Sequence, residues 1–140
     1  MEIFKNRKEQ TLEALEAHLV KTSYPAGTKL YSRGELGTEL FFIRRGLVGN
    51  MLPLNGDRFR RINTCGRGSF VGELAFLDGD THSTDAIALT DVDVFVLSRK
   101  NLDAFAEVHK KAALNLMEGL ASIVTNRVRF LTAELVSMES

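Results

Sequence analysis

The sequence DVDVFVL at residues 91–97 places Val92, Val94 and Val96 at every second position. Successive side chains of a strand point to opposite faces, so the three valines would share one face. Residues 40–44, LFFIR, form another apolar run of strand length. These two segments are therefore predicted to be β-strands.

Between Pro25 and Arg99, short apolar runs of this kind alternate with glycines, which is typical of many short strands joined by turns. Asn55-Gly56 supplies the positive φ angles of a two-residue hairpin turn, so residues 48–54 should pair with residues 58–64. The regular spacing predicts a mainly β fold, an antiparallel β-roll of the jelly-roll or double-stranded β-helix type. The glycines of this region are Gly27, Gly34, Gly37, Gly46, Gly49, Gly56, Gly66, Gly68, Gly72 and Gly79.

Helical spacing of apolar residues flanks this region on both sides. Leu12, Leu15, Leu19 and Val20 lie at helical spacing and predict an amphipathic helix over residues 7–19. After Arg99 the spacing predicts a short helix near residues 101–107 and then a long one. No proline-rich or low-complexity linker interrupts the chain, so one domain is expected. Its expected parts are an N-terminal helix in residues 1–23, the β-roll in residues 24–99, and C-terminal helices in residues 100–140, the last from about 110 to 137.

The long last helix carries apolar residues at alternating steps of three and four, which is the pattern of a coiled-coil seam. The seam consists of Leu114, Met117, Ala121, Val124, Val128, Leu131, Leu135 and Met138. A second strip, Leu116, Leu120 and Ile123, would pack on the roll while the seam meets a partner. A homodimer is the expected use of the seam. The alternative is a single helix buried against its own domain.

The composition is that of an ordinary globular domain. The 140 residues are 44% hydrophobic and 26% charged. With 18 basic and 18 acidic residues the formal net charge is zero, which argues against nucleic acid as a partner. The N-terminus has no signal-peptide core, and no run of 18 apolar residues occurs, so no membrane insertion of this chain is expected. With its single cysteine, Cys65, the chain is expected to be cytoplasmic.

Residues 68–86, GSFVGELAFLDGDTHSTDA, contain the candidate binding site. A glycine at position 72 followed by a short helical turn would leave the backbone N–H groups of Leu74 and Ala75 without helical partners. Such groups attract a phosphate. The alternative is a helical turn that only joins two strands, with Glu73 in solvent.

This stretch resembles the phosphate-binding cassette of cyclic nucleotide-binding domains, the family of the catabolite activator and of kinase regulatory subunits. The segments YPAGT at residues 24–28, Gly34-Glu35 and LFFIRRG at residues 40–46 are similar to the opening strands of that family. The resemblance implies a regulatory ligand-sensing module without enzymatic activity, which transmits the ligand state through its C-terminal helix. It also implies that Glu73 accepts a hydrogen bond from the ribose 2′-hydroxyl. The implied ligand, cyclic AMP or cyclic GMP, would be held by Gly72, Glu73, Leu74 and Ala75, helped by His82 and Ser83, with its base against Ile62 and Cys65.

One position departs from the family pattern. Where relatives that bind cyclic nucleotides have an arginine, this chain has His82. An imidazole is mostly uncharged near neutral pH, so affinity for a cyclic phosphate should fall by about tenfold to more than a hundredfold. The nearby carboxylates of Asp78, Asp80 and Asp85 would favour a protonated His82, which is a hypothesis that predicts tighter binding at lower pH.

Two other functions compete with ligand sensing. The domain could have lost its nucleotide and serve as a dimerisation or interaction module, which the missing arginine favours. A metal-dependent enzyme of the cupin type is disfavoured, because His18, His82 and His109 fall in different elements without an H-x-H pair. No metal or cofactor is therefore expected.

The attached partner is suggested only by resemblance. Catabolite activator-like regulators continue into a helix-turn-helix, which does not follow here. The chain is similar to modules at the tail of bacterial sulfate-permease-type transporters. The expectation is a module on a larger protein such as a transporter, in the cytoplasm or at the cytoplasmic face of a membrane.

Overall fold

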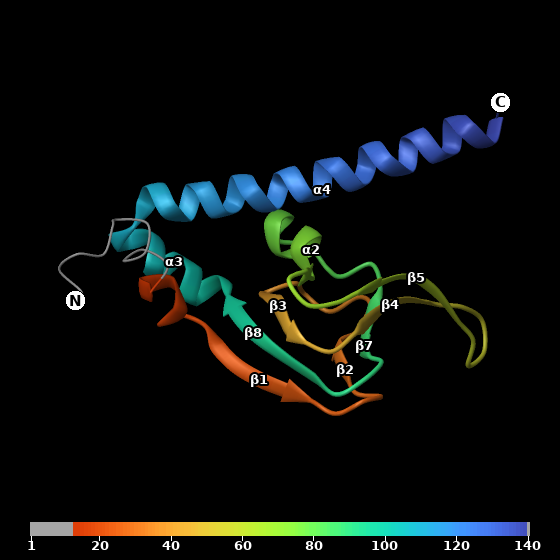
Figure 1. Cartoon of the computed structure of the whole chain (residues 1–140), viewed down its shortest axis with the longest axis horizontal. Coiled ribbons are helices and arrows are strands. Elements are labelled where there is room, and N and C mark those ends of the chain that lie inside the picture. Colours follow the sequence, from red (N-terminus) through yellow and green to blue (C-terminus); the bar gives the residue numbers. More distant parts are fainter. Residues whose placement is uncertain (1–12, 140) are drawn as a thin grey trace.

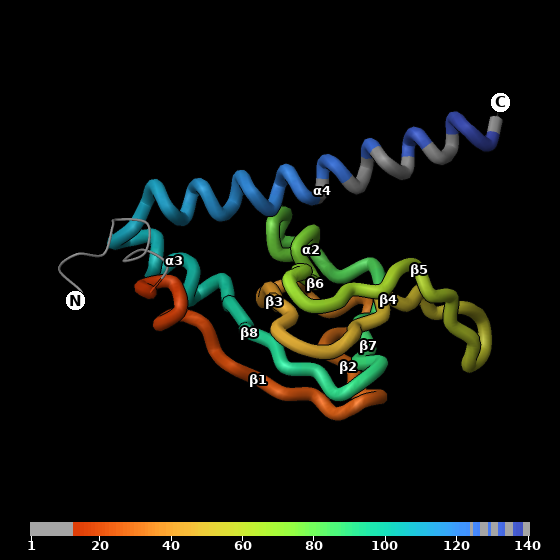
Figure 2. Tube along the Cα trace, viewed as in Figure 1, coloured from red at the N-terminus to blue at the C-terminus, as the bar shows by residue number. Residues whose placement is uncertain are grey.

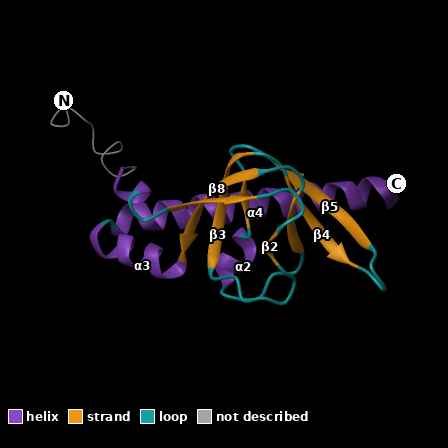
Figure 3. Ribbon diagram, turned by 90° about the horizontal axis from the view of Figure 1, so that it is seen from below, coloured by secondary structure: helices purple, strands orange, loops and turns teal. Residues whose placement is uncertain are grey.

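The computed structural model describes residues 13–139, except for the side chains at positions 124, 127, 128, 130, 131, 134, 135 and 139. Two four-stranded sheets make up the roll, and every strand pair within them is antiparallel. The first sheet has the order β1 (Val20–Tyr24), β8 (Val92–Ser98), β3 (Glu39–Arg45), β6 (Phe70–Val71). The second has the order β2 (Lys29–Tyr31), β7 (Asp85–Ala88), β4 (Val48–Pro53), β5 (Phe59–Cys65). The predicted antiparallel β-roll is confirmed (Figure 3).

The main core lies inside the roll, between the two sheets. Val92, Val94 and Val96 all point into it and are at most 6% exposed, as their alternation along β8 predicts. Phe41 and Ile43 of β3 reach the same core from the neighbouring strand. Burying these branched and aromatic side chains supplies the main stabilisation of the roll.

Three helices cover one end of the roll: α2 (Glu73–Asp78), α3 (Arg99–Val108) and α4 (Lys110–Glu139). Ser98 caps α3 by accepting a hydrogen bond from the Asn101 amide. In Figure 1, α2 lies between α4 and the strands. A second apolar cluster, called the helix-facing cluster here, joins these elements. Its buried members are Leu40, Phe76, Leu97, Leu102, Phe105, Ala113 and Leu120.

The N-terminal region differs from the prediction. One helical turn covers residues 13–16, and β1 begins at Val20, so the roll starts before the expected boundary at residue 23. The strand forms because Val20–Tyr24 pairs in register with β8 and satisfies its backbone groups there. Val20, placed by its spacing on the apolar face of a helix, is 55% exposed on this strand. The expected helical residues 7–12 lie outside the described residues.

The predicted hairpin of residues 48–54 and 58–64 is confirmed, but its turn is different. The Leu54 amide donates to the Arg58 carbonyl, so the loop is residues 55–57 rather than a two-residue turn. Gly56 has a φ of 74°, and no residue other than glycine has a positive φ in the described chain. Asn55 therefore does not take the left-handed conformation that a type I′ turn requires, and the longer loop replaces it.

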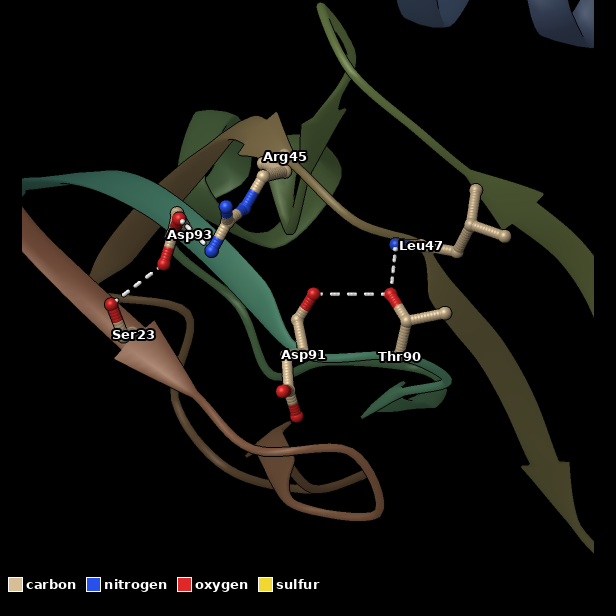
Figure 4. Close-up of polar contacts among 6 residues, drawn as sticks. All are labelled: Ser23, Arg45, Leu47, Thr90, Asp91 and Asp93. Atoms are coloured by element: carbon tan, nitrogen blue, oxygen red, sulfur yellow. Dashed lines mark hydrogen bonds and ion pairs between the residues drawn. The ribbon is translucent and has the colours of Figure 1, made fainter.

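Polar contacts connect strands β1, β3 and β8 and the neighbouring turns at one edge of the roll (Figure 4). Asp93 of β8 accepts a hydrogen bond from the Ser23 hydroxyl at 2.7 Å and forms an ion pair with Arg45 at 3.0 Å. The Leu47 amide donates to the Thr90 hydroxyl at 3.0 Å, which ties two turns together. Strands far apart in sequence are thereby held in register at this end.

In the first half of the long helix α4, the two predicted surfaces are separate except at Met117. Leu116 and Leu120 belong to the helix-facing cluster, and Leu120 is 1% exposed. On the seam, Leu114 is 58% exposed, whereas Met117 packs partly against the same cluster. The later part of α4 continues past the other helices (Figure 2).

Candidate functional site

The turn at Gly72 has the backbone shape that its sequence predicts. Gly72 has a φ of 82°, and it stands at the start of α2 with no side chain hydrogen-bonded as a cap. The first amides of a helix have no partners within the helix, so the Gly72 turn leaves donors at the start of α2. A side chain at position 72 would meet the His82 ring, with Cβ only 3.1 Å from its Cε1 atom. Glycine is thus required both by the backbone and by the space.

A pocket of about 330 Å³ opens beside this turn. Of the predicted site residues, Gly72, Glu73, Leu74, Ala75, His82, Ser83 and Ile62 line it. The other lining residues are Tyr31, Asn50, Asn63, Asp78, Asp80, Thr81 and Thr84. Its volume is at the small end of the range for small-molecule sites. The structure therefore brings the cassette and the second sheet together around one cavity.

Cys65 is the predicted site residue that the structure places elsewhere. It is 5% exposed, packs in the core inside the roll, and does not line the pocket. The physical reason is its position opposite Val48 at the end of β5, where both side chains enter the core. Asn63, two residues earlier on the same strand, lines the pocket instead.

His82 is a buried, packed residue of the pocket lining. Its ring stacks on Tyr31 with the centroids 3.6 Å apart and the planes 9° from parallel. Its backbone amide donates to the Glu35 carbonyl, and its own carbonyl accepts from the Gly34 amide. Only 6% of His82 is exposed. The imidazole is therefore a packed element of the pocket rather than a loose loop side chain.

The structure does not support a protonated His82. Burial lowers the pKa of His82, and the negative charge of Glu35 only partly opposes this shift. The three carboxylates predicted to raise the pKa have other partners. Asp85 accepts the Arg33 amide and pairs with Lys29 at 3.1 Å. Asp80 accepts the Thr81 amide, and Asp78 accepts the Asp80 amide.

This shift predicts a pH dependence of stability. The unfolded chain binds a proton at His82 near pH 6.5, whereas the folded chain binds it only at lower pH. The free energy of unfolding should therefore fall as the pH drops from about 7 to 5, and this part of the fall should vanish in His82→Gln. Urea unfolding of both proteins at several pH values measures the difference. Parallel curves for the two would contradict the buried neutral state of His82.

Asn50 lines the pocket and connects two other lining residues, and the sequence pattern did not predict this role. Its side-chain oxygen accepts a hydrogen bond from the Tyr31 hydroxyl at 3.1 Å, and its amide donates to Asn63 at 2.7 Å. Asn50 thereby fixes Tyr31, on which His82 stacks. An asparagine within the apolar strand β4 was the signal that could have identified this position.

No group of three or more histidine, cysteine, aspartate or glutamate side chains lies close enough to hold a metal ion among the described residues. Within residues 13–139, no helix combines the length and apolar character needed to cross a membrane.

Comparison with known proteins places this geometry in a family. The sequence model of the cyclic nucleotide-binding domain matches residues 21–109. A cyclic AMP receptor protein of Thermus thermophilus is 29% identical over 112 residues, which are 80% of this chain and 50% of that protein. Glutaminase 1 of Bradyrhizobium diazoefficiens is 31% identical over 106 residues, which are 76% of this chain and 16% of that enzyme. The chain thus spans half or less of these curated relatives.

The fold comparison agrees. A crystal structure of a cyclic nucleotide-binding domain from Methylobacillus flagellatus superposes with a TM-score of 0.83, at 22% identity, covering 96% of this chain and 75% of that one. This likeness concerns the fold. The match of the family model over residues 21–109 shows that the chain belongs to the cyclic nucleotide-binding domain family, a family of regulatory domains.

Proposed function

We propose that this chain is a ligand-sensing regulatory module that binds cyclic AMP or cyclic GMP in the pocket at Gly72 and performs no catalysis. The observation that carries the proposal is the pocket itself, which contains the uncapped start of α2 and Glu73 in a chain of this family. Glu73 is 5% exposed, and its carboxylate is an acceptor for ribose hydroxyls. Leu74 and Ile62 supply apolar surface for a base.

The contacts of α2 support transmission from the pocket to α4. Phe76 lies on α2, four residues after Gly72, and packs in the helix-facing cluster with Leu120 of α4. Arg99 of α3 donates to the Phe76 carbonyl, and its guanidinium lies 4.4 Å from the Phe76 ring centroid. A ligand that moves the start of α2 would therefore shift the packing of α4, and with it an attached effector or transporter.

Titration calorimetry of the chain with cyclic AMP and cyclic GMP tests the proposal. We expect saturable binding of at least one of them, weakened by the lack of a fixed cation at position 82. Glu73→Gln should lower the affinity by about tenfold or more, because the charged acceptor for the ribose is removed. Glu107→Gln on the exposed surface of α3 is the matched control and should leave the affinity unchanged. No heat with either nucleotide would favour the alternative, an interaction module that no longer binds cyclic nucleotides.

We also propose that the chain forms a homodimer through the α4 seam. The exposed Leu114 and Ala121 support this, since a seam residue left in water gains by pairing with a second copy. We further propose that the module works in the cytoplasm or at the cytoplasmic face of a membrane protein.

The seam proposal predicts a specific loss of association. Leu114→Glu combined with Ala121→Glu should weaken dimerisation by about a hundredfold, because each copy would bury uncompensated charge. Asn115→Glu combined with Ser122→Glu adds the same charge at exposed neighbouring positions and should leave the dimer intact. Sedimentation equilibrium gives both constants. A wild-type chain that stays monomeric at all concentrations would contradict the proposal.

A further inference from the structure

The charges around the pocket favour an uncharged ligand over an anionic one. Glu73, Asp78 and Asp80 line it, and among the described residues no lysine or arginine does. His82 lines it as a buried ring with a lowered pKa, so it contributes no fixed positive charge near neutral pH. A cyclic phosphate would enter a cavity that already carries three negative side chains.

The backbone donors at the Gly72 turn are too weak to reverse this. A full-length helix has the equivalent of about half a positive charge at its N-terminus, and α2 has only six residues. The three carboxylates carry more formal charge than that partial charge; Glu73 is buried, whereas Asp78 and Asp80 are exposed and each accepts a backbone amide. The electrostatic balance of the pocket is therefore negative.

Hydrogen-bonding capacity leads to the same conclusion. Carboxylates only accept hydrogen bonds, and so do the oxygens of a phosphate diester. A ribose whose 3′ and 5′ positions carry free hydroxyls would instead present donors to these acceptors. The hydroxyls of Thr81 and Ser83, also in the lining, can pair with either kind of group.

We propose that the pocket binds an uncharged nucleoside more tightly than the corresponding cyclic nucleotide. The inference rests on the proposed function, because it concerns the ligand of the same pocket. The ribose would lie against Glu73 and the base against Ile62 and Leu74, while the free hydroxyls would face Asp78 and Asp80.

Calorimetric titration of the chain with adenosine, guanosine, cyclic AMP and cyclic GMP at about 50 and 300 mM salt tests the inference. At low salt each nucleoside should bind at least about tenfold more tightly than its cyclic nucleotide. Salt should strengthen cyclic nucleotide binding, since it screens a repulsion, and should leave nucleoside binding unchanged. Cyclic nucleotides that bind more tightly than nucleosides, and weaken with salt, would overturn the inference and leave the proposed function standing. No binding of any of the four would contradict both.

Matched variants separate charge from shape. Asp78→Asn combined with Asp80→Asn keeps the side-chain oxygens that accept the backbone amides but removes two charges. It should tighten cyclic nucleotide binding by about fivefold without improving nucleoside binding. Asp57→Asn combined with Asp103→Asn removes the same charge from exposed positions outside the pocket and should change neither. Equal effects of the two pairs would overturn the inference.

Discussion

Replacing His82 by arginine is expected to tighten the binding of cyclic AMP by at least about tenfold. An arginine is charged at every accessible pH and forms paired hydrogen bonds with a phosphate, each charge-assisted contact contributing about 1.5–3 kcal/mol. A guanidinium is planar and stacks on aromatic rings, so it can replace the imidazole on the face of Tyr31. Calorimetry of wild type and His82→Arg measures the change.

The control for this substitution is His82→Gln, which changes the shape of the side chain without adding charge. It should not tighten cyclic AMP binding. Adenosine provides a second control, because a cation gains nothing from an uncharged ligand. Equal constants for wild type and His82→Arg would mean that the missing cation does not limit affinity.

Phe76→Ala is expected to destabilise the fold by about 3–5 kcal/mol, the usual cost of removing a fully buried aromatic ring. Phe76 is 0% exposed and joins α2 to α3 and α4. Its loss would leave a cavity in the helix-facing cluster and remove the ring beside the Arg99 guanidinium. Thermal unfolding should show a midpoint lower by about 10 °C or more.

Phe59→Ala is the matched comparison, because it removes the same ring from the exposed end of β5. Phe59 is 47% exposed, so its loss should cost less than about 1 kcal/mol. Similar midpoints for the two variants would contradict the assigned packing of α2.

The strands could be predicted from sequence because their burial follows a local pattern. Val92, Val94 and Val96 enter the core as their spacing requires. The division of α4 between Leu116 and Leu120 inside and Leu114 outside was predictable for the same reason. In each case the period of the apolar residues equals the period of the backbone.

The ends of the helices and strands could not be predicted from such local patterns. Residues 17–19 and Val20 continue a helical spacing, yet pairing with β8 turns Val20–Tyr24 into a strand. The loop at residues 55–57 likewise depends on the register of β4 and β5 rather than on Asn55-Gly56 alone. Such long-range pairing overrides local preference.

The candidate site, too, could be predicted only in part from the sequence. The Gly72 turn was visible because only glycine fits its backbone, whereas the roles of Tyr31 and Asn50 depend on strands that meet only in the fold. The predictions for Cys65 and His82 failed for the same reason. Both depend on which side chains become buried, and burial is decided only when the roll assembles. Neither the position of Cys65 in the core nor the desolvation of His82 can be found from neighbouring residues alone.

The most direct test of the binding site is the amide NMR spectrum of the chain during titration with adenosine or cyclic AMP. We expect saturable shifts concentrated at Gly72 to Ala75 and at His82 and Ser83, with smaller shifts around Leu120 of α4. Shifts confined to the outer face of β3 and β8, or none at saturating ligand, would contradict this expectation.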